Sequence, residues 1–510
     1  MDAVWRRVAW TAGAAAGCAA SFAGFWAAQR GAHVSMIDLM VYRAEGATVR
    51  GGGDLYAMRA TYARLPTTYP PFAALLFVPL TWLRAGTMRT AATAGNLLLL
   101  VALVTLSLRV AGRPRRVPRA AAALAVAAVA VWCEPVWTTL RYGQVNLLLA
   151  VLVLWDLTRP AAHRWAGAGT GLAAGIKLTP ALFAVLLAVA GLLALRRAAR
   201  PEVRAWGAAY RRRALVAAGT FAGTVAVAAL ALPYDSRRFW TGVVLAPDRV
   251  GLGEDTANQS LRGVVARLQH TGDPGTLWLT AAVLAGAAGL AVAVTALLAG
   301  DRLPYGAGWA TVSCALTALL VSPVSWSHHW VWAVPMLVLL GSEALRRRDP
   351  RWAVGTAAGC ALFCSFALWD VPHGPGRHEL RQSAPQMLLS AGYPLAAVAF
   401  LALAGTVAVR ALYTTPTRSV STADGVRLLP GPGDGAAVGP TVGPAVGPAV
   451  ELTTGPALGP GAGLTGDPGR GPAHGPGPGP ADAPGPGLAA PGTGSARPAG
   501  ANPRHPAGSS

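Results

Sequence analysis

The feature that most constrains this chain is a succession of long apolar runs separated by short polar segments. A helix needs about 20 apolar residues to cross the hydrocarbon core of a bilayer, and helices are favoured there because they satisfy their own backbone hydrogen bonds. Some crossings can be shorter where the surrounding protein helps. The chain is therefore predicted to be an all-α polytopic membrane protein with about 12 transmembrane helices. The expected crossings are 8–29, 88–111, 119–138, 143–158, 165–179, 180–196, 214–233, 276–299, 306–324, 328–344, 351–369 and 391–413.

The composition supports this class. Charged residues make up 13% of the chain, against roughly 25% in ordinary soluble domains. The formal net charge of +21 would suggest a nucleic-acid partner in a soluble protein. Here the arginines cluster in short loops between apolar runs, where positive charge keeps a loop on the cytoplasmic side. The expected partner is the lipid bilayer, and no nucleic acid is expected.

Charge also predicts the topology. If the proline-rich segment 70–83 stays interfacial or re-entrant, the arginine-rich loops 109–119, 196–213 and 346–351 all face the cytoplasm, together with both termini. If that segment crosses, all three loops face outward. The first arrangement is favoured, and it requires residues 165–196 to form a helical hairpin that breaks near Pro180.

Two domains are predicted from the change in composition near residue 414. Residues 1–413 form the transmembrane domain. Residues 414–510 are rich in Gly, Pro and Ala and have too few large apolar residues for a core, so they should form a disordered cytoplasmic tail.

Neither a disulfide framework nor a metal site is expected. The cysteines are odd in number and lie in apolar runs, which favours small hydrophobic packing residues. They are Cys18, Cys133, Cys314, Cys360 and Cys364. The neighbouring His328 and His329 point in different directions on a helix, and no third ligand lies at a regular spacing.

Polar motifs gather on the face opposite the arginine-rich loops. The first outer segment, 30–69, holds Asp38, Tyr42, Glu45 and Asp54. Asp38 lies close to the membrane surface, where a carboxylate could act as a base toward a hydroxyl. A solvated loop acid or a helix cap is an equally good interpretation.

The next outer turn, EPVWTTLRYGQVN, carries a dense set of polar side chains between two apolar helices. It is either a binding surface or a capped turn in which Asn146 satisfies the start of the next helix. Its polar residues are Glu134, Arg141, Tyr142, Gln144 and Asn146.

Lys177, in GIKLTP, is the only lysine of the chain. A compact ammonium can meet a phosphate without the planar geometry of arginine. A lysine that extends to the interface is the alternative, but its place in a break between two apolar helices favours a functional role.

Two further outer segments complete the polar face. In 234–275, Asn258, Gln259 and Arg262 offer amides for sugar hydroxyls and a guanidinium for phosphate, although a capped surface helix would look similar. The motif SPVSWSHHWVW places two histidines among tryptophans. Tryptophan is common at membrane interfaces, whereas the histidines suit a base or a hydrogen-bond donor.

Taken in order, TYPPF, RYGQVNLLL, GIKLTP, NQSLRG and SPVSWSHHW, together with Asp38, resemble glycosyltransferase family 87 over about residues 30–345. Members are polyprenol-phosphate-mannose-dependent α-mannosyltransferases of actinobacteria and belong to the GT-C class. The resemblance implies a GT-C-like fold in the plasma membrane and an extracytoplasmic active site. It also implies a lipid-phosphate mannose donor, a glycolipid or lipoglycan acceptor and an α-1,2 linkage. No cofactor is implied, and metal dependence stays open.

The resemblance also implies roles for single residues. Asp38 is the leading base, with His328 or His329 as a second catalytic candidate. Lys177 and Arg262 would bind the donor phosphate. The expected substrate-binding residues are Tyr42, Tyr69, Arg141, Gln144, Asn146, Asn258, Gln259 and Trp326.

Two alternatives stay open at this point. An arabinofuranosyltransferase using decaprenyl-phosphate arabinose would carry the same residues. A transporter or flippase for lipid-linked sugars would also place charges between broken helices. The hydropathy pattern has no inverted repeat and the motifs lie at one face, which favours an enzyme.

Overall fold

The structure is a computed structural model that describes residues 2–111, 117–160, 163–196, 201–374 and 376–413. All of these residues lie in one compact unit, Met1–Gly439. The predicted tail, 414–510, lies outside the described residues.

The described residues are almost entirely helical, with one two-stranded antiparallel sheet. The first half of the chain contains α1 (Asp2–Gly31), α2 (Ile37–Arg50), β1 (Arg59–Ala60), β2 (Leu65–Pro66), α3 (Pro71–Phe77), the 3-10 helix η1 (Val78–Trp82), α4 (Ala85–Val110), α5 (Arg119–Ala130), α6 (Glu134–Tyr142), α7 (Asn146–Leu157), α8 (Ala168–Ile176), α9 (Ala181–Arg196) and α10 (Pro201–Ala231). The second half contains α11 (Pro233–Thr241), η2 (Val243–Leu245), η3 (Pro247–Val250), α12 (Leu261–Leu268), α13 (Gly275–Leu298), η4 (Gly300–Arg302), α14 (Gly306–Val321), η5 (Ser327–Trp332), α15 (Ala333–Arg347), α16 (Pro350–Cys364), η6 (Ala367–Trp369), η7 (His378–Arg381), α17 (Ala384–Ser390) and α18 (Gly392–Tyr413).

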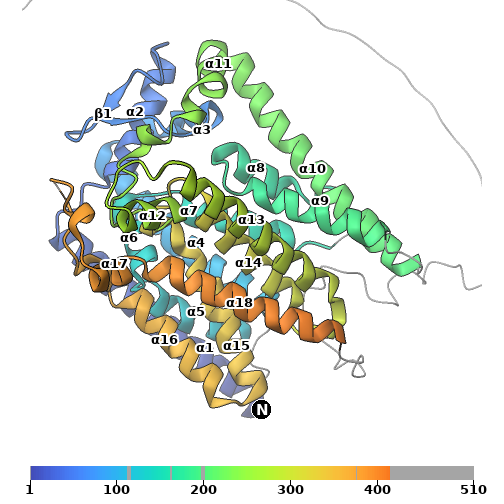
Figure 1. The fold of residues 1–510 in the computed structure, drawn as a ribbon. Coiled ribbons are helices and arrows are strands. Elements are labelled where there is room, and N and C mark those ends of the chain that lie inside the picture. Colours follow the sequence, from blue (N-terminus) through green and yellow to red (C-terminus); the bar gives the residue numbers. More distant parts are fainter. Residues whose placement is uncertain (1, 112–116, 161–162, 197–200, 375, 414–510) are drawn as a thin grey trace, which may run out of the picture. The chain divides into compact units, whose positions relative to one another are not determined.

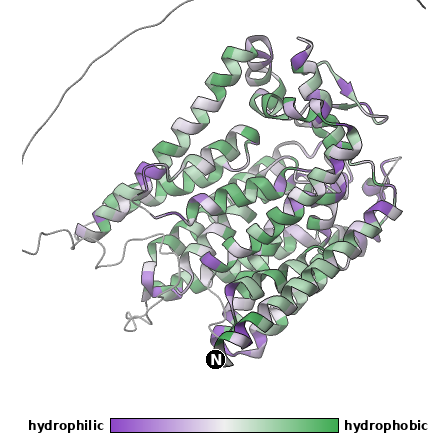
Figure 2. Cartoon of the chain, turned by 180° about the vertical axis from the view of Figure 1, so that it is seen from behind, coloured by the Kyte–Doolittle hydropathy of each residue, from purple (hydrophilic) through white to green (hydrophobic). Residues whose placement is uncertain are grey.

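The chain is a membrane protein, and each of the twelve predicted crossings contains a helix. Within the described ranges, five helices are long and apolar enough to cross a bilayer alone: α1, α4, α10, α13 and α18. The others are shorter or bent, so the count of twelve crossings stays a prediction. Figure 2 shows that the long helices are mainly hydrophobic and that hydrophilic residues concentrate toward their ends.

Two helical boundaries differ from the sequence-based expectation. Residues 119–138 do not form one helix, because α5 and α6 meet at a 78° bend. Pro135 stands in the first turn of α6, where its fixed φ and missing N–H favour a helix start. The arginine-rich segment 196–213 is also less of a loop than expected, since α10 already begins at Pro201.

One other expectation agrees with the structure. The hairpin break near Pro180 is present, since α8 ends at Ile176 and α9 begins at Ala181. Residues 70–83 form the seven-residue α3 and the five-residue η1. The pair has as many residues as α7, one of the predicted crossings, so its interfacial or re-entrant position stays a prediction.

The helices pack around one large apolar core. The most extensive helix contacts join α13 to α14, α9 to α10 and α1 to α5. Figure 1 shows that α2, α3, β1 and α11 lie together at one end of this unit, opposite the N-terminus. Helix α2 carries Asp38, Tyr42 and Glu45. All five cysteines are free thiols, and the Sγ atoms of Cys133 and Cys364 lie 3.1 Å apart.

Candidate active site

Helix α2 presents three polar side chains on one face. Asp38, Tyr42 and Glu45 are spaced four and three residues apart, the spacing that places helical side chains beside one another. The helix lies close against the end of α3, where a Cβ built on Gly46 would come within 2.6 Å of the Phe77 carbonyl oxygen. The Tyr42 ring stacks on the Phe77 ring at 4.4 Å between centroids. The small residue and the stacked rings therefore set the position of this face.

Gln144 connects this face to the turn after α6. Its Nε2 donates to Oδ2 of Asp38 at 2.7 Å, and its Oε1 accepts from the hydroxyls of Tyr42 at 2.7 Å and Tyr69 at 3.0 Å. Gly143 makes the turn possible, since its φ is +70° and an added Cβ would meet the Leu39 Cβ at 2.7 Å. The amide thus orients the Asp38 carboxylate.

The surroundings of the two acids differ. Burial raises the pKa of Asp38, while the Gln144 hydrogen bond and the positive charge of Lys177 act against the increase. Burial raises the pKa of Glu45 to about 8, and the Asp38 charge adds to the effect. The Thr67 hydroxyl lies beside Glu45 without full hydrogen-bond geometry and lowers the pKa only partly. Glu45 is therefore mostly protonated at neutral pH.

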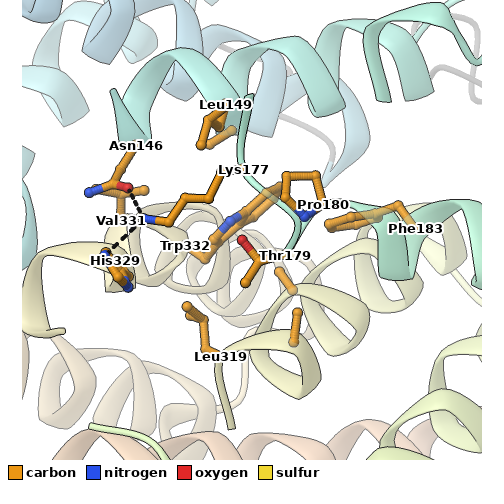
Figure 3. Close-up of a pocket in the computed structure, with 13 residues that line it drawn as sticks. Asn146, Leu149, Lys177, Thr179, Pro180, Phe183, Leu319, His329, Val331 and Trp332 are labelled. Carbon is orange, nitrogen blue, oxygen red and sulfur yellow. Dashed lines mark hydrogen bonds between the residues drawn. The ribbon is translucent and has the colours of Figure 1, made fainter. Parts of the chain in front are cut away.

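Lys177 lies in the break between α8 and α9, where its backbone is extended. Its Nζ is 2.9 Å from Nε2 of His329 and donates to Oδ1 of Asn146 at 3.2 Å (Figure 3). The ammonium also lies 5.5 Å from the centre of the Tyr69 ring. If Nε2 of His329 accepts this proton, the imidazole carries its own proton at Nδ1. The lysine ammonium is therefore held by polar side chains of α7 and η5.

An apolar pocket begins at Lys177 and runs between α7, α9 and α14. Lys177, Asn146, His329 and Thr179 supply its polar groups, and the rest of the lining is hydrophobic (Figure 3). The apolar lining consists of Leu149, Ala150, Pro180, Phe183, Ala315, Ala318, Leu319, Val331 and Trp332. A ligand with a charged end and a hydrocarbon chain matches this division.

Glu134 is a buried acid at the start of α6. Its fully buried carboxylate accepts hydrogen bonds from Thr138 and Ser327, both at 2.8 Å. Tyr393 at 2.9 Å and Trp369 at 3.3 Å complete the set. Four donors offset the cost of burying the acid and join α6 to η5 and α18. The sequence flagged Glu134 only as part of a polar turn, and nothing in the spacing predicted its partners.

Hydrogen bonds and ring contacts fix the positions of Asn146, His328 and His329. The amide of Asn146 donates to the His328 carbonyl at 2.9 Å while its oxygen faces Lys177. The His328 ring meets Tyr142 at 5.3 Å and His329 at 4.7 Å between centroids. Its buried Nε2 has no hydrogen-bond partner among the described residues. His329, not His328, contacts the lysine.

Several predicted site residues are engaged elsewhere. The side-chain amides of Asn258 and Gln259 donate hydrogen bonds to backbone carbonyls. The acceptors are Gly253 and Pro323 for Asn258, and Thr256 and Ser390 for Gln259. Arg262 pairs with Asp248 at 2.5 Å and lies 5.9 Å from the Trp278 ring. The structure does not join these three side chains to Lys177.

Two other predicted substrate-binding residues, Arg141 and Trp326, do not line the pocket. Arg141 is exposed at the end of α6. The ring of Trp326 packs on Gly251, where an added Cβ would come within 2.8 Å of it. In the part of the chain that the structure describes, no group of three or more His, Cys, Asp or Glu side chains could hold a metal ion. The predicted lack of a cofactor stays a prediction.

The comparison with known proteins identifies the family. The model of glycosyltransferase family 87 matches residues 68–323, about half of the chain. A polyprenol-phosphate-mannose-dependent α-(1-2)-phosphatidylinositol mannoside mannosyltransferase of Mycolicibacterium smegmatis is 35% identical over 402 residues, covering 74% of this chain and 85% of that protein. The chain belongs to glycosyltransferase family 87. This family 87 chain is therefore a glycosyltransferase, which confirms the predicted enzyme class.

A second relative of the family 87 chain is a polyprenol-phosphate-mannose-dependent α-(1-2)-phosphatidylinositol pentamannoside mannosyltransferase of Mycobacterium tuberculosis. It is 34% identical, and the match covers 66% of this chain and 75% of that protein. Among solved structures, ArnT from Cupriavidus metallidurans bound to undecaprenyl phosphate matches with a TM-score of 0.38 and 18% identity, covering 76% of this chain and 77% of that one.

Proposed function

We propose that this membrane glycosyltransferase transfers mannose from polyprenol-phosphate mannose to a hydroxyl of a phosphatidylinositol mannoside, forming an α-1,2 linkage on the extracytoplasmic face. Donor and acceptor classes are those in the names of its mycobacterial relatives. The positive-inside distribution of arginine supports the side, since α2, η5 and the GIKLTP turn lie on the loops opposite the arginine-rich ones.

The observation that carries this proposal is the position of the single lysine at the polar end of an apolar pocket. Lys177 is held by Asn146 and His329, and hydrophobic side chains line the rest of the space (Figure 3). A polyprenyl phosphate has the same two parts. Its phosphate would meet the ammonium, and its chain would lie along the wall that includes Leu149, Phe183 and Leu319.

The chemistry follows from the two charges. Asp38 takes the proton of the acceptor hydroxyl, and that oxygen attacks the anomeric carbon of mannose with inversion. The bond to the donor phosphate breaks, and the phosphate leaves with both electrons. Lys177 stabilises the negative charge that grows on the phosphate as this bond breaks. Gln144 keeps the Asp38 carboxylate oriented throughout.

The test is a transfer assay with purified protein in lipid, using polyprenol-phosphate mannose and a panel of phosphatidylinositol mannosides. Mannosylation of at least one acceptor is expected. Asp38→Asn keeps an acceptor atom for Gln144 but removes the charge, so we expect kcat to fall by roughly 10²- to 10⁴-fold with donor binding retained. Lys177→Ala should weaken donor binding.

The matched control is Asp273→Asn, which changes an exposed carboxylate on the loop before α13. It should transfer mannose at the wild-type rate. No transfer to any acceptor by the wild-type protein would overturn the proposed function. Full activity of both Asp38→Asn and Lys177→Ala would overturn the proposed site.

A further inference from the structure

The region outside the pocket contains a cluster of arginines that the proposed chemistry does not use. Arg59, Arg238 and Arg249 come from β1, α11 and η3, yet all three contact the turn formed by residues 54–58. Arg59 donates to the Met58 carbonyl at 2.8 Å, and Arg249 donates to the Tyr56 carbonyl at 2.9 Å. We name these three residues the arginine cluster.

The cluster keeps an excess of positive charge. Two carboxylates contact the same turn: Asp54, which pairs with Arg238, and Asp235, which accepts from the Leu55 amide at 3.0 Å. Burial raises the pKa of Asp235. Burial also lowers the pKa of Arg249, and the positive charges of Arg59 and Arg238 lower it further, so Arg249 lies within electrostatic reach of both.

The cluster also has N–H donors that bind no carboxylate. Arg59 is exposed, and its hydrogen bonds go only to the backbone carbonyls of its two preceding residues. Nε of Arg249 is buried and has no hydrogen-bond partner among the described residues. Guanidinium groups with donors that no carboxylate occupies are suited to bind a phosphate oxyanion.

These charges are not explained by membrane topology. The positive-inside rule places arginine on the cytoplasmic side, whereas α2, β1 and α11 lie at the end of the unit opposite the N-terminus (Figure 1). On the proposed orientation, the cluster faces away from the cytoplasm. An excess of arginine on the extracytoplasmic side is better explained by an anionic ligand than by membrane topology.

The cluster is connected to the candidate active site through two tyrosines. The Tyr56 hydroxyl donates to the Tyr69 carbonyl at 2.9 Å, and the Tyr69 hydroxyl reaches Gln144, the partner of Asp38. Leu178, next to Lys177, packs on the apolar cluster that contains Tyr56. The turn that the cluster contacts is therefore linked to Asp38 through the buried side chains of Tyr56 and Tyr69.

We propose that Arg59, Arg238 and Arg249 bind the phosphodiester of the acceptor lipid and so place its sugar hydroxyl at Asp38. This inference rests on the proposed function. It assigns the cluster to the acceptor, whose phosphate and reacting hydroxyl lie several bonds apart, and leaves the donor phosphate at Lys177.

The test uses Arg59→Ala and Arg249→Gln in the full-length protein. Glutamine retains an N–H for the Tyr56 carbonyl but carries no charge. Each variant is assayed in neutral phosphatidylcholine vesicles with two acceptors: a phosphatidylinositol mannoside and an alkyl α-mannoside that lacks phosphate. The matched control is Arg381→Ala, which removes an exposed arginine in η7.

We expect KM for the phosphatidylinositol mannoside to rise about tenfold, the change equivalent to losing one charge-assisted hydrogen bond. KM for the neutral mannoside and for the donor should stay at the wild-type value. Equal losses with both acceptors would overturn the inference in favour of a structural role. A loss that occurs only when anionic phospholipid is added to the vesicles would also overturn it, because the bulk lipid would then be the ligand.

A binding measurement separates this inference from the proposed function. Fluorescent phosphatidylinositol mannoside is titrated into each variant in neutral nanodiscs, with no donor present. Weaker binding by Arg59→Ala and Arg249→Gln, but not by Arg381→Ala, supports the cluster even if no transfer is detected. Unchanged binding would overturn the inference while leaving mannosyl transfer intact.

Discussion

Replacing Glu45 with glutamine tests the electrostatics of the site most directly. Glu45 is fully buried on α2, next to Asp38 in the fold, and burial raises the pKa of its carboxyl to about 8 from an ordinary 4.5. A group that binds its proton more tightly in the folded state stabilises the fold most at low pH. This stability is lost as the pH rises through the folded pKa.

The magnitude follows from the two values. The difference between 4.5 and about 8, at roughly 1.4 kcal/mol for each pH unit, is worth about 5 kcal/mol in full. Integrated only between about pH 5.5 and pH 8.5, it is about 3 kcal/mol. Glutamine is neutral at every pH, so Glu45→Gln should not lose this stability. Wild type should therefore become less stable relative to the variant by about 3 kcal/mol across that window.

The assay is thermal unfolding in detergent, followed by the fluorescence of the 17 tryptophans at several pH values. We expect the melting temperature of wild type to fall by several degrees relative to Glu45→Gln as the pH rises. Asp273→Asn, which changes an exposed carboxylate, should follow wild type across the same range. A constant difference between wild type and Glu45→Gln would refute the reasoning, because Glu45 would then not be protonated in the native state.

Three other predictions concern the same end of the protein. The charge of Lys177 lowers the pKa of Asp38. Lys177→Met should therefore shift the acidic limb of the pH profile of kcat to higher pH. An unchanged profile would show that Lys177 does not influence the ionisation of Asp38. Gly143→Ala should cost about 1–2 kcal/mol for its left-handed backbone and more for the contact with Leu39. A melting temperature and kcat equal to wild type would contradict that. In a cysteine-free background, cysteines at Arg204 and Asp273 should react with impermeant reagent from opposite sides of the membrane, and same-side labelling would contradict the topology.

The sequence by itself determined the class of the protein and most of its helices. Every predicted crossing contains a helix, and the helix break lies near Pro180, as the backbone restrictions of proline predict. These features depend on composition over about 20 residues and on local backbone restrictions, which are readable without knowing what packs against what. The motif order also predicted the family, because a resemblance uses the order of residues and not their distances in space.

Only the tertiary structure decided which polar side chains form one site. Asp38, Gln144, Lys177 and His329 are brought together from four separate segments. By contrast, Arg262 looked equally suited to a phosphate in the sequence and instead pairs with Asp248. A polar residue near an outer loop can serve a ligand or the backbone. The difference lies in long-range contacts that local sequence does not encode.

The same limit explains the buried acids. Glu45 and Glu134 are both acids in outer segments of the sequence, and both have no exposed surface in the structure. Glu134 receives one hydrogen bond from its own helix and three from helices far along the chain, whereas the Glu45 oxygens have no full hydrogen bond among the described residues. Charge state depends on solvent access and on partners contributed by distant segments. The pattern of residues along the chain therefore placed both acids in outer segments, and packing alone determined the hydrogen-bond partners and the charge state of each.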